Sequence, residues 1–122
     1  YIPGGRIALH ERAEDAVLRE VREELECDAA IVRPLWVHQS FFSEDVNGER
    51  YHELGFYFLV RLAEERYSGL YEPFTLYEGG RARHTFEWLP MDRLGERYFY
   101  PLFLKERLPA LPQTLELVTT VE

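Results

Sequence analysis

Residues 11–26 restrict the fold of this 122-residue chain more than any other segment. Apolar residues recur there at helical spacing and most other positions are charged, which predicts an amphipathic helix from residue 11 to about residue 26. The apolar positions are Ala13, Ala16, Val17, Leu18, Val21 and Leu25. The helix therefore has an apolar stripe that faces a core and an acidic face beside it.

The acidic face concentrates charge. Residues 11–26 hold seven acids against three arginines, which is half of the formal net charge of −8. At about 100° per residue, Glu20, Glu23 and Glu24 share an arc of about 100°. Like charges three and four residues apart repel each other, whereas hard divalent cations prefer oxygen ligands and remove that repulsion. The cluster indicates either a solvated face paired with Arg19 and Arg22 or a cation site.

Composition disfavours several function classes. An acidic chain repels nucleic acid polymers and anionic membrane surfaces. No apolar run approaches the ~20 residues of a membrane helix. The single cysteine, Cys27, excludes an internal disulfide framework and a cysteine zinc site, and we expect it to be a small buried hydrophobe. The length predicts a single domain over residues 1–122.

The other segments predict strands, turns and short helices. The turn Pro3-Gly4-Gly5 precedes the helix. Strands are predicted at residues 30–42, 51–62, 85–89 and 115–121, with Asn47-Gly48 as the hairpin turn between the first two. Pro34 marks an edge or a bulge. Both faces of residues 51–62 are largely apolar, which predicts a strand covered on both sides.

The predicted non-strand segments lie in the second half of the chain. Residues 64–80 predict a long loop, and residues 90–94 predict a turn into a short helical segment. A second helix is predicted at residues 100–108, with Pro101 at its first position and Pro109 and Pro112 beyond its end.

The residues around the acidic face follow a fixed order: Gly5, five residues, Glu11, seven residues, Arg19-Glu20-Val21, one residue, Glu23-Glu24. This order resembles the Nudix box, the signature of the Nudix hydrolases, and seven positions match in register. Glu26 stands where the family usually has glycine, and Cys27 stands where it has an aliphatic residue. Because glycine supplies a left-handed helix end there, Glu26 predicts either a costly helix end or a longer helix.

The resemblance implies an α/β fold, the Nudix-type α/β/α sandwich with a mixed β-sheet. The N-terminal strands that normally precede the box are missing, so we expect further residues before Tyr1. It also implies a cytoplasmic hydrolase that uses Mg²⁺ or Mn²⁺. Such an enzyme cleaves the diphosphate linkage of a nucleoside diphosphate joined to another moiety, by water attack on phosphorus. Many such proteins dimerise, so a homodimer is a possible assembly.

The resemblance also implies roles for the box residues. Glu20, Glu23, Glu24 and the carbonyl of Gly4 correspond to metal ligands. Arg19 corresponds to the residue that orients Glu20 or Glu23 by charge-assisted hydrogen bonds. Gly5 and Glu11 correspond to residues that shape and brace the loop.

The general base varies across the family, and its candidates here are Glu20, Glu53, Glu78 and Glu87. Glu53 begins an apolar strand, so it is either a site acid or a hydrogen-bonded structural acid. Glu87 alternates with two aromatic residues and points either to the site or to solvent.

Histidines and aromatic residues have weaker patterns. We expect His38 and His84 to be structural, and His52 to be structural or a substrate contact. Four aromatic side chains of the predicted loop either stack on a nucleobase or anchor the loop: Tyr67, Tyr71, Phe74 and Tyr77.

Three other interpretations compete with the hydrolase. A non-catalytic Nudix-fold module that binds or senses a nucleotide would usually lack box carboxylates, and here all three are present. An isomerase of isoprenoid diphosphates would need cysteine chemistry, for which Cys27 is badly placed. An acidic structural domain would match the box by chance, which seven positions in register disfavour.

Overall fold

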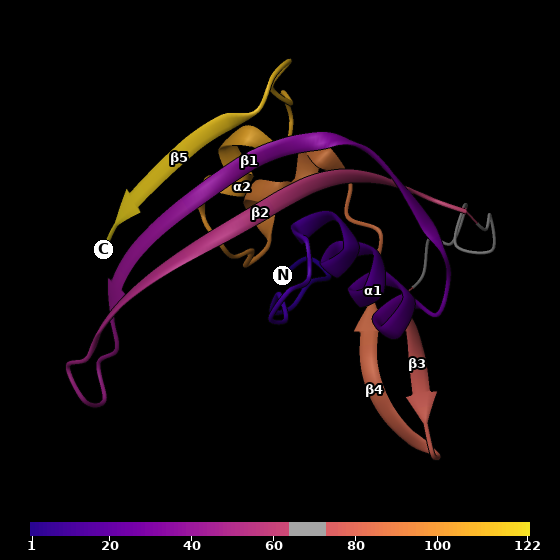
Figure 1. Ribbon diagram of the computed structural model, residues 1–122. Helices are drawn as coiled ribbons and strands as arrows, with labels where there is room; N and C mark the ends of the chain where they lie inside the picture. The colour runs from indigo at the N-terminus through magenta and orange to yellow at the C-terminus, as the bar shows by residue number, and fades with distance from the viewer. Residues whose placement is uncertain (64–72) are drawn as a thin grey trace. The chain divides into compact units, whose positions relative to one another are not determined.

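The computed structural model describes residues 1–63 and 73–122, except the side chains of Glu78 and Ala82 (Figure 1). The elements run α1 (Ala13–Leu25), β1 (Ala29–Ser43), β2 (Arg50–Leu62), β3 (Phe74–Glu78), β4 (Arg81–Phe86), the 3₁₀-helix η2 (Met91–Glu96), α2 (Phe103–Arg107) and β5 (Glu116–Val121). They form two compact units. One comprises residues 1–30 and 62–110, and the other comprises residues 31–61 and 111–122.

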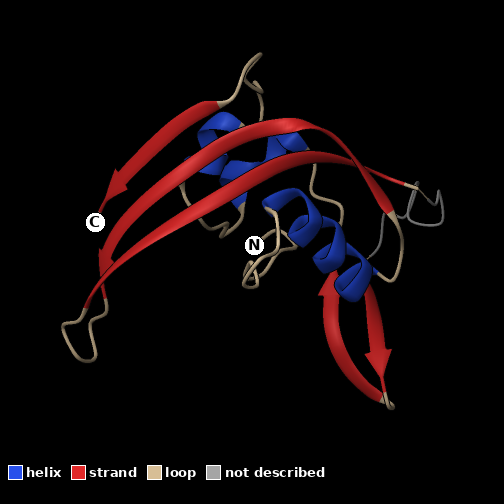
Figure 2. Cartoon of the chain, viewed as in Figure 1, coloured by secondary structure: helices blue, strands red, loops and turns tan. Residues whose placement is uncertain are grey.

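The main sheet has the strand order β2-β1-β5. β5 runs parallel to β1, from the pair Trp36 and Glu116 to the pair Phe41 and Val121. β2 returns from β1 through a short loop and runs in the opposite direction (Figure 2). The sheet is therefore mixed, and with the helices it confirms the predicted α/β class of the Nudix-type sandwich.

The core of the first unit lies against the apolar stripe of α1. Val21, Leu25 and Cys27 are buried together, and partly buried apolar side chains pack against them: Ala29, Leu62, Phe74 and Phe86. The predicted stripe and the buried Cys27 are confirmed. This packing fixes which face of α1 is left for the acids.

The ends of α1 differ slightly from the prediction. The helix begins at Ala13, after Arg12 in an extended conformation. In the preceding loop, the N–H of Ala8 donates to the side chain of Glu11 at 3.0 Å. It ends at Leu25, and Glu26 takes the left-handed conformation, with φ 55° and ψ 35°. The N–H of Glu26 donates to the carbonyl of Arg22 at 3.0 Å. The helix thus makes the left-handed end without glycine, and the alternative of a longer helix is wrong.

The predicted loop at residues 64–80 is wrong over its second half. Residues 74–78 form β3, which pairs antiparallel with β4. Gly79 and Gly80 connect the strands with φ of 58° and 80°, values that favour glycine and suit a two-residue hairpin turn. Because this turn starts the partner strand at Arg81, the strand predicted at residues 85–89 instead spans Arg81–Phe86.

The aromatic residues of the segment 64–80 lie in different environments. Phe74 packs in the core of the first unit and stacks on Phe86 with ring centres 5.6 Å apart, so it is an anchor. Tyr77 is exposed. Tyr67 and Tyr71 lie outside the described residues.

The second unit confirms the predicted hairpin turn between β1 and β2. Gly48 has φ 70°, and its N–H donates to the carbonyl of Glu44 at 2.9 Å. β1 is the central strand, but its pairing with β5 starts only at Trp36. Pro34 therefore precedes that ladder, where its missing N–H costs no hydrogen bond to β5.

The prediction that residues 51–62 are covered on both faces is wrong. β2 lies at the edge of the sheet, and Leu54 and Phe56 are 55% and 44% exposed. An apolar run on a strand does not by itself supply a second covering layer. Elsewhere in this unit Leu35, Trp36 and Val118 are buried, and the ring of His38 hydrogen-bonds the hydroxyl of Thr120 at 2.8 Å.

The predicted helix at residues 100–108 is shorter than expected. α2 begins at Phe103. The N–H of Leu104 bonds the carbonyl of Pro101, three residues back, so a tight turn precedes the helix and Pro101 is not its first residue. η2 confirms the predicted short helical segment. In the described part of the chain, no helix has the length and apolar character needed to cross a membrane.

Candidate active site

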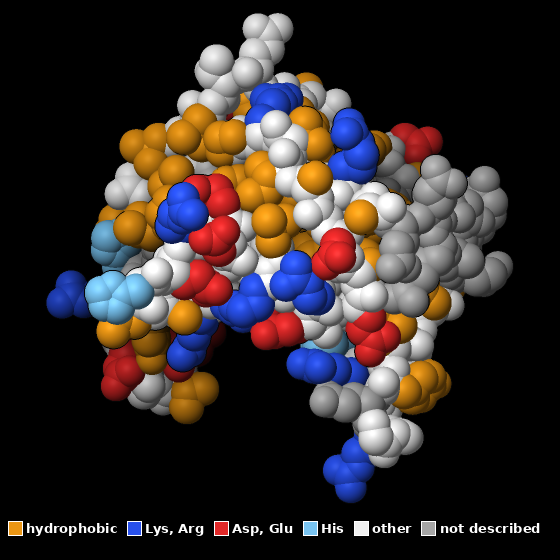
Figure 3. Space-filling view, turned by 45° about the vertical axis from the view of Figure 1, so that its right-hand side comes forward, with side chains coloured by type: hydrophobic (Ala, Val, Ile, Leu, Met, Phe, Trp, Pro, Cys, Tyr) orange, Lys and Arg blue, Asp and Glu red, His pale blue; other side chains and the backbone are white. Residues whose placement is uncertain are grey.

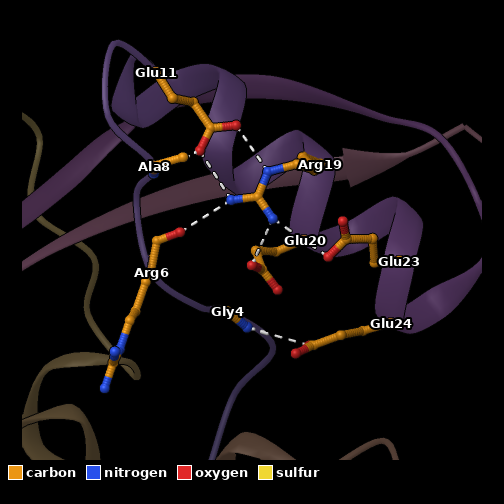
Figure 4. Close-up of polar contacts among 8 residues, drawn as sticks. All are labelled: Gly4, Arg6, Ala8, Glu11, Arg19, Glu20, Glu23 and Glu24. Carbon is orange, nitrogen blue, oxygen red and sulfur yellow. Dashed lines mark hydrogen bonds and ion pairs between the residues drawn. The ribbon is translucent and has the colours of Figure 1, made fainter.

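The loop before α1 and the acidic face of α1 meet around one guanidinium (Figure 4). Nε of Arg19 donates to Glu11 at 2.8 Å, and Nη1 donates to Glu20 at 2.9 Å and to Glu23 at 3.3 Å. Nη2 donates to the carbonyl of Arg6 at 3.0 Å and to Glu11 at 2.9 Å. Arg19 thus orients both carboxylates that the box pattern indicated. All five of its N–H groups are used.

Glu11 braces the loop. One of its oxygens accepts the N–H of Ala8, and both accept from Arg19. The Arg19 guanidinium, and then the N–H of Ala8, lower the pKa of Glu11 from 4.5 to about 2. The carboxylate stays ionised at neutral pH, so the loop and the helix remain tied by a permanent ion pair. This contact agrees with the bracing role expected for Glu11.

Gly5 lies against the carboxyl group of Glu20. A Cβ atom at Gly5 would lie 2.3 Å from Oε1 and 2.7 Å from Oε2 of Glu20. Real Cβ atoms do not approach other atoms so closely, and only glycine leaves this space. The side chain of Glu20 is 14% exposed, which agrees with its place between the loop and Arg19. The absence of a side chain at Gly5 therefore leaves room for the carboxyl group of Glu20.

Gly4 and Glu24 form the second contact between loop and helix. The N–H of Gly4 donates to Oε2 of Glu24 at 3.3 Å, which places the backbone of Gly4 beside that carboxylate (Figure 4). Burial raises the pKa of Glu24, and the charge of Glu20 raises it further. The N–H of Gly4 and the charges of His84 and Arg83 on β4 lower it. The site thus holds a partly buried carboxylate whose ionisation is opposed by the charge of a second one.

The donor chemistry of this site fits Mg²⁺ or Mn²⁺. Within the described residues, Oε2 of Glu20, Oε1 of Glu23 and Oε1 of Glu24 accept no hydrogen bond. Carboxylate oxygens are the ligands that such hard cations prefer. Across residues 1–63 and 73–122, however, no three His, Cys, Asp or Glu side chains already stand in a ligand arrangement. Rotation of the glutamate side chains is therefore required to gather their oxygens around an ion.

The remaining base candidates lie outside the box helix. Glu87 is ion-paired with Arg97, so that carboxylate already has a partner. Glu53 is exposed on β2, in the second unit. Burial lowers the pKa of His38, and the negative charge of Glu53 acts in the opposite direction. The side chain of Glu78 lies outside the described residues. Glu20 is the candidate that the structure brings together with the other box residues.

The family model of the NUDIX domain matches residues 1–111. The chain belongs to the Nudix family. The match covers the box and extends through α2, well beyond the residues that carried the resemblance. The curated proteins include no significant match to the chain. Membership of the Nudix family supports a hydrolase of nucleoside diphosphate derivatives that acts on pyrophosphate bonds.

The structure adds two side chains of β4 near the Nudix box that the sequence pattern did not assign to it. His84 and Arg83 act electrostatically on Glu24 although they lie about sixty residues away along the chain. The pair Gly79-Gly80 is the sequence signal that could have located His84 and Arg83 on a strand. A two-glycine hairpin turn after an aromatic stretch predicts that a strand starts directly after it.

Proposed function

We propose that the chain is a metal-dependent Nudix hydrolase that cleaves the diphosphate linkage of a nucleoside diphosphate joined to another moiety, by water attack on phosphorus. The observation that carries the proposal is that Glu20 and Glu24 lie against Gly5 and Gly4 of the loop, while Arg19 holds Glu23 beside Glu20. Arg19 orients two of these carboxylates, and each of the three keeps one oxygen that accepts no hydrogen bond in the described part of the chain. An acidic cluster of this kind meets an anionic substrate only through cations.

The chain's own residues have defined tasks in this reaction. Glu20, Glu23, Glu24 and the carbonyl of Gly4 would hold Mg²⁺ or Mn²⁺, which when bound neutralises phosphate charge and acidifies water. Arg19 is a positioning residue, because its guanidinium fixes Glu20 and Glu23. Gly5 leaves room for Glu20, which in addition is our candidate for the base that removes the proton of the attacking water.

The test is a substrate panel assayed with Mg²⁺ and with Mn²⁺. The panel contains ADP-ribose, dinucleoside polyphosphates, oxidised nucleotides, nucleotide sugars and nucleoside diphosphates. We expect cleavage at a diphosphate linkage of at least one class, complete loss of cleavage with excess EDTA, and recovery when Mg²⁺ is returned, because the carboxylates have no other means of binding phosphate.

Two results would contradict the proposal. Cleavage that persists in EDTA would remove the role of the carboxylates as metal ligands. Binding of a nucleotide without any cleavage would instead indicate the non-catalytic Nudix-fold module.

A further inference from the structure

A diphosphate needs hydrogen-bond donors in addition to cations, and Arg19 cannot supply them. Each of its N–H groups already has an acceptor, and those acceptors are Glu11, Glu20, Glu23 and the carbonyl of Arg6. Charge-assisted hydrogen bonds to phosphate oxygens are a strong means of orienting such a substrate. A donor on another element next to the acidic face would supply what Arg19 cannot.

The β3–β4 hairpin turns one face toward α1. Phe74 and Phe86 form a pair in its register, and both pack against Val21, Leu25 and Cys27. Side chains alternate along a strand, so His84, two residues before Phe86, lies on that same face. The rings of His84 and Phe86 are 5.9 Å apart. Thr85 lies on the opposite face, where its hydroxyl bonds that of Thr75 at 2.8 Å.

His84 is thereby on the hairpin face that packs on α1, close to the end of the helix that carries Glu24. Glu24 directly precedes Leu25, a member of the core on which the hairpin packs. The charge of His84 lies near enough to Glu24 to lower the pKa of that carboxyl, against the larger effect of burial. Figure 3 shows that acidic and basic side chains lie side by side on the face of the molecule that it draws.

We propose that His84 is a substrate-binding residue, whose imidazole N–H donates a hydrogen bond to a phosphate oxygen of the diphosphate held at Glu24. The inference rests on the proposed function and adds a donor to it. Imidazole suits this place because it always keeps at least one N–H donor, and because its nitrogen does not compete with carboxylate oxygens for Mg²⁺. The hydrogen bond lies outside the Nudix box and on a different element.

Two substitutions separate this role from simple packing. His84→Phe keeps an aromatic ring against Phe86 and removes the donor, whereas His84→Gln keeps an N–H donor and removes the ring. We expect His84→Phe to lower kcat/KM for the cleaved panel substrate by about 10- to 100-fold, mainly through KM, because a hydrogen bond to a charged group is lost. His84→Gln should stay within about 5-fold of the wild type, since the donor is retained. Thr85→Val, on the opposite face, is the matched control and should behave as the wild type.

A binding measurement gives a readout that does not depend on turnover. The probe is α,β-methylene-ADP, a diphosphate with a non-cleavable bridge, titrated calorimetrically with Mg²⁺ present. His84→Phe should weaken its binding by about 10-fold or more, and His84→Gln and Thr85→Val should not.

The outcomes are distinguishable. If the wild type cleaves a diphosphate and His84→Phe matches it in KM and in affinity for the analogue, His84 has only a packing role and the inference is overturned while the proposed function stands. If His84→Gln loses as much as His84→Phe, the ring and not the donor matters, which also overturns it. If the wild type cleaves no member of the panel, the proposed function fails first and the inference fails with it.

Discussion

Replacing Glu24 by glutamine is expected to lower kcat by about two to three orders of magnitude at saturating Mg²⁺. A bound cation stabilises the transition state by several kcal/mol, and each ~1.4 kcal/mol is a factor of ten in rate. Glutamine has almost the same shape but no charge, so it cannot replace a carboxylate ligand. Steady-state kinetics on the cleaved panel substrate measure the loss.

The fold should tolerate this substitution, because the amide oxygen of glutamine can still accept the N–H of Gly4. Burial raises the pKa of Glu24 in the folded protein above its value in the unfolded chain. The ionised carboxylate of Glu24 therefore destabilises the metal-free fold at neutral pH. This destabilisation decreases as the pH falls through the pKa of Glu24 in the folded protein, and it is absent below the pKa of Glu24 in the unfolded chain. Thermal unfolding at pH 7 without metal should show the variant at least as stable as the wild type, with the difference shrinking in acid.

The matched control for Glu24→Gln is Glu14→Gln. Glu14 lies in the first turn of the same helix and is exposed, so its neutralisation changes the net charge equally without touching the carboxylate cluster. We expect wild-type kinetics for the control. Equal kcat in Glu24→Gln and wild type under excess Mg²⁺ would exclude Glu24 from the metal site.

Replacing Gly5 by alanine is expected to lower kcat/KM by about 100-fold while the fold remains intact. The new methyl group would lie 2.3 Å from the Glu20 carboxyl, so the carboxyl must move. Since that carboxyl is the end of a flexible side chain, the movement costs little stability. A displacement of about 1 Å in a catalytic group nevertheless costs on the order of 100-fold in rate.

Gly95→Ala is the control for the glycine substitution. Gly95 is exposed in η2, and a Cβ atom there meets nothing within 4 Å, so activity and melting temperature should match the wild type. Full activity in Gly5→Ala would show that the position of Glu20 against the loop does not matter for turnover. A large drop in melting temperature would show instead that Gly5 serves the fold.

The sequence predicted the box helix well because its signals are local. Helical spacing placed Val21 and Leu25 in the core. The position of Arg19 indicated a contact with Glu20 or Glu23, and the structure contains both. For Glu26 the sequence predicts either a costly helix end or a longer helix, and the structure shows the left-handed end.

Contacts between distant segments could not be predicted in the same way. No periodicity shows that the carbonyl of Arg6 takes one N–H of Arg19, or that β4 brings His84 toward Glu24. The sequence predicts a loop where β3 lies, because Gly79 and Gly80 are typical both of irregular segments and of a hairpin turn. For β2, the apolar content of both faces predicts that both are covered. The prediction fails because apolar content shows which faces a strand could bury, whereas it does not show which other elements pack on them.

The central claim is that the box glutamates gather around a divalent cation, and Mn²⁺ binding tests it most directly. Electron paramagnetic resonance of free Mn²⁺ counts the ions that the wild type and a Glu20→Gln, Glu23→Gln, Glu24→Gln triple variant remove from solution. The account predicts saturable binding by the wild type and its loss in the folded triple variant, because the variant lacks the oxygen ligands. Equal Mn²⁺ binding by both proteins, or none by the wild type, would contradict it.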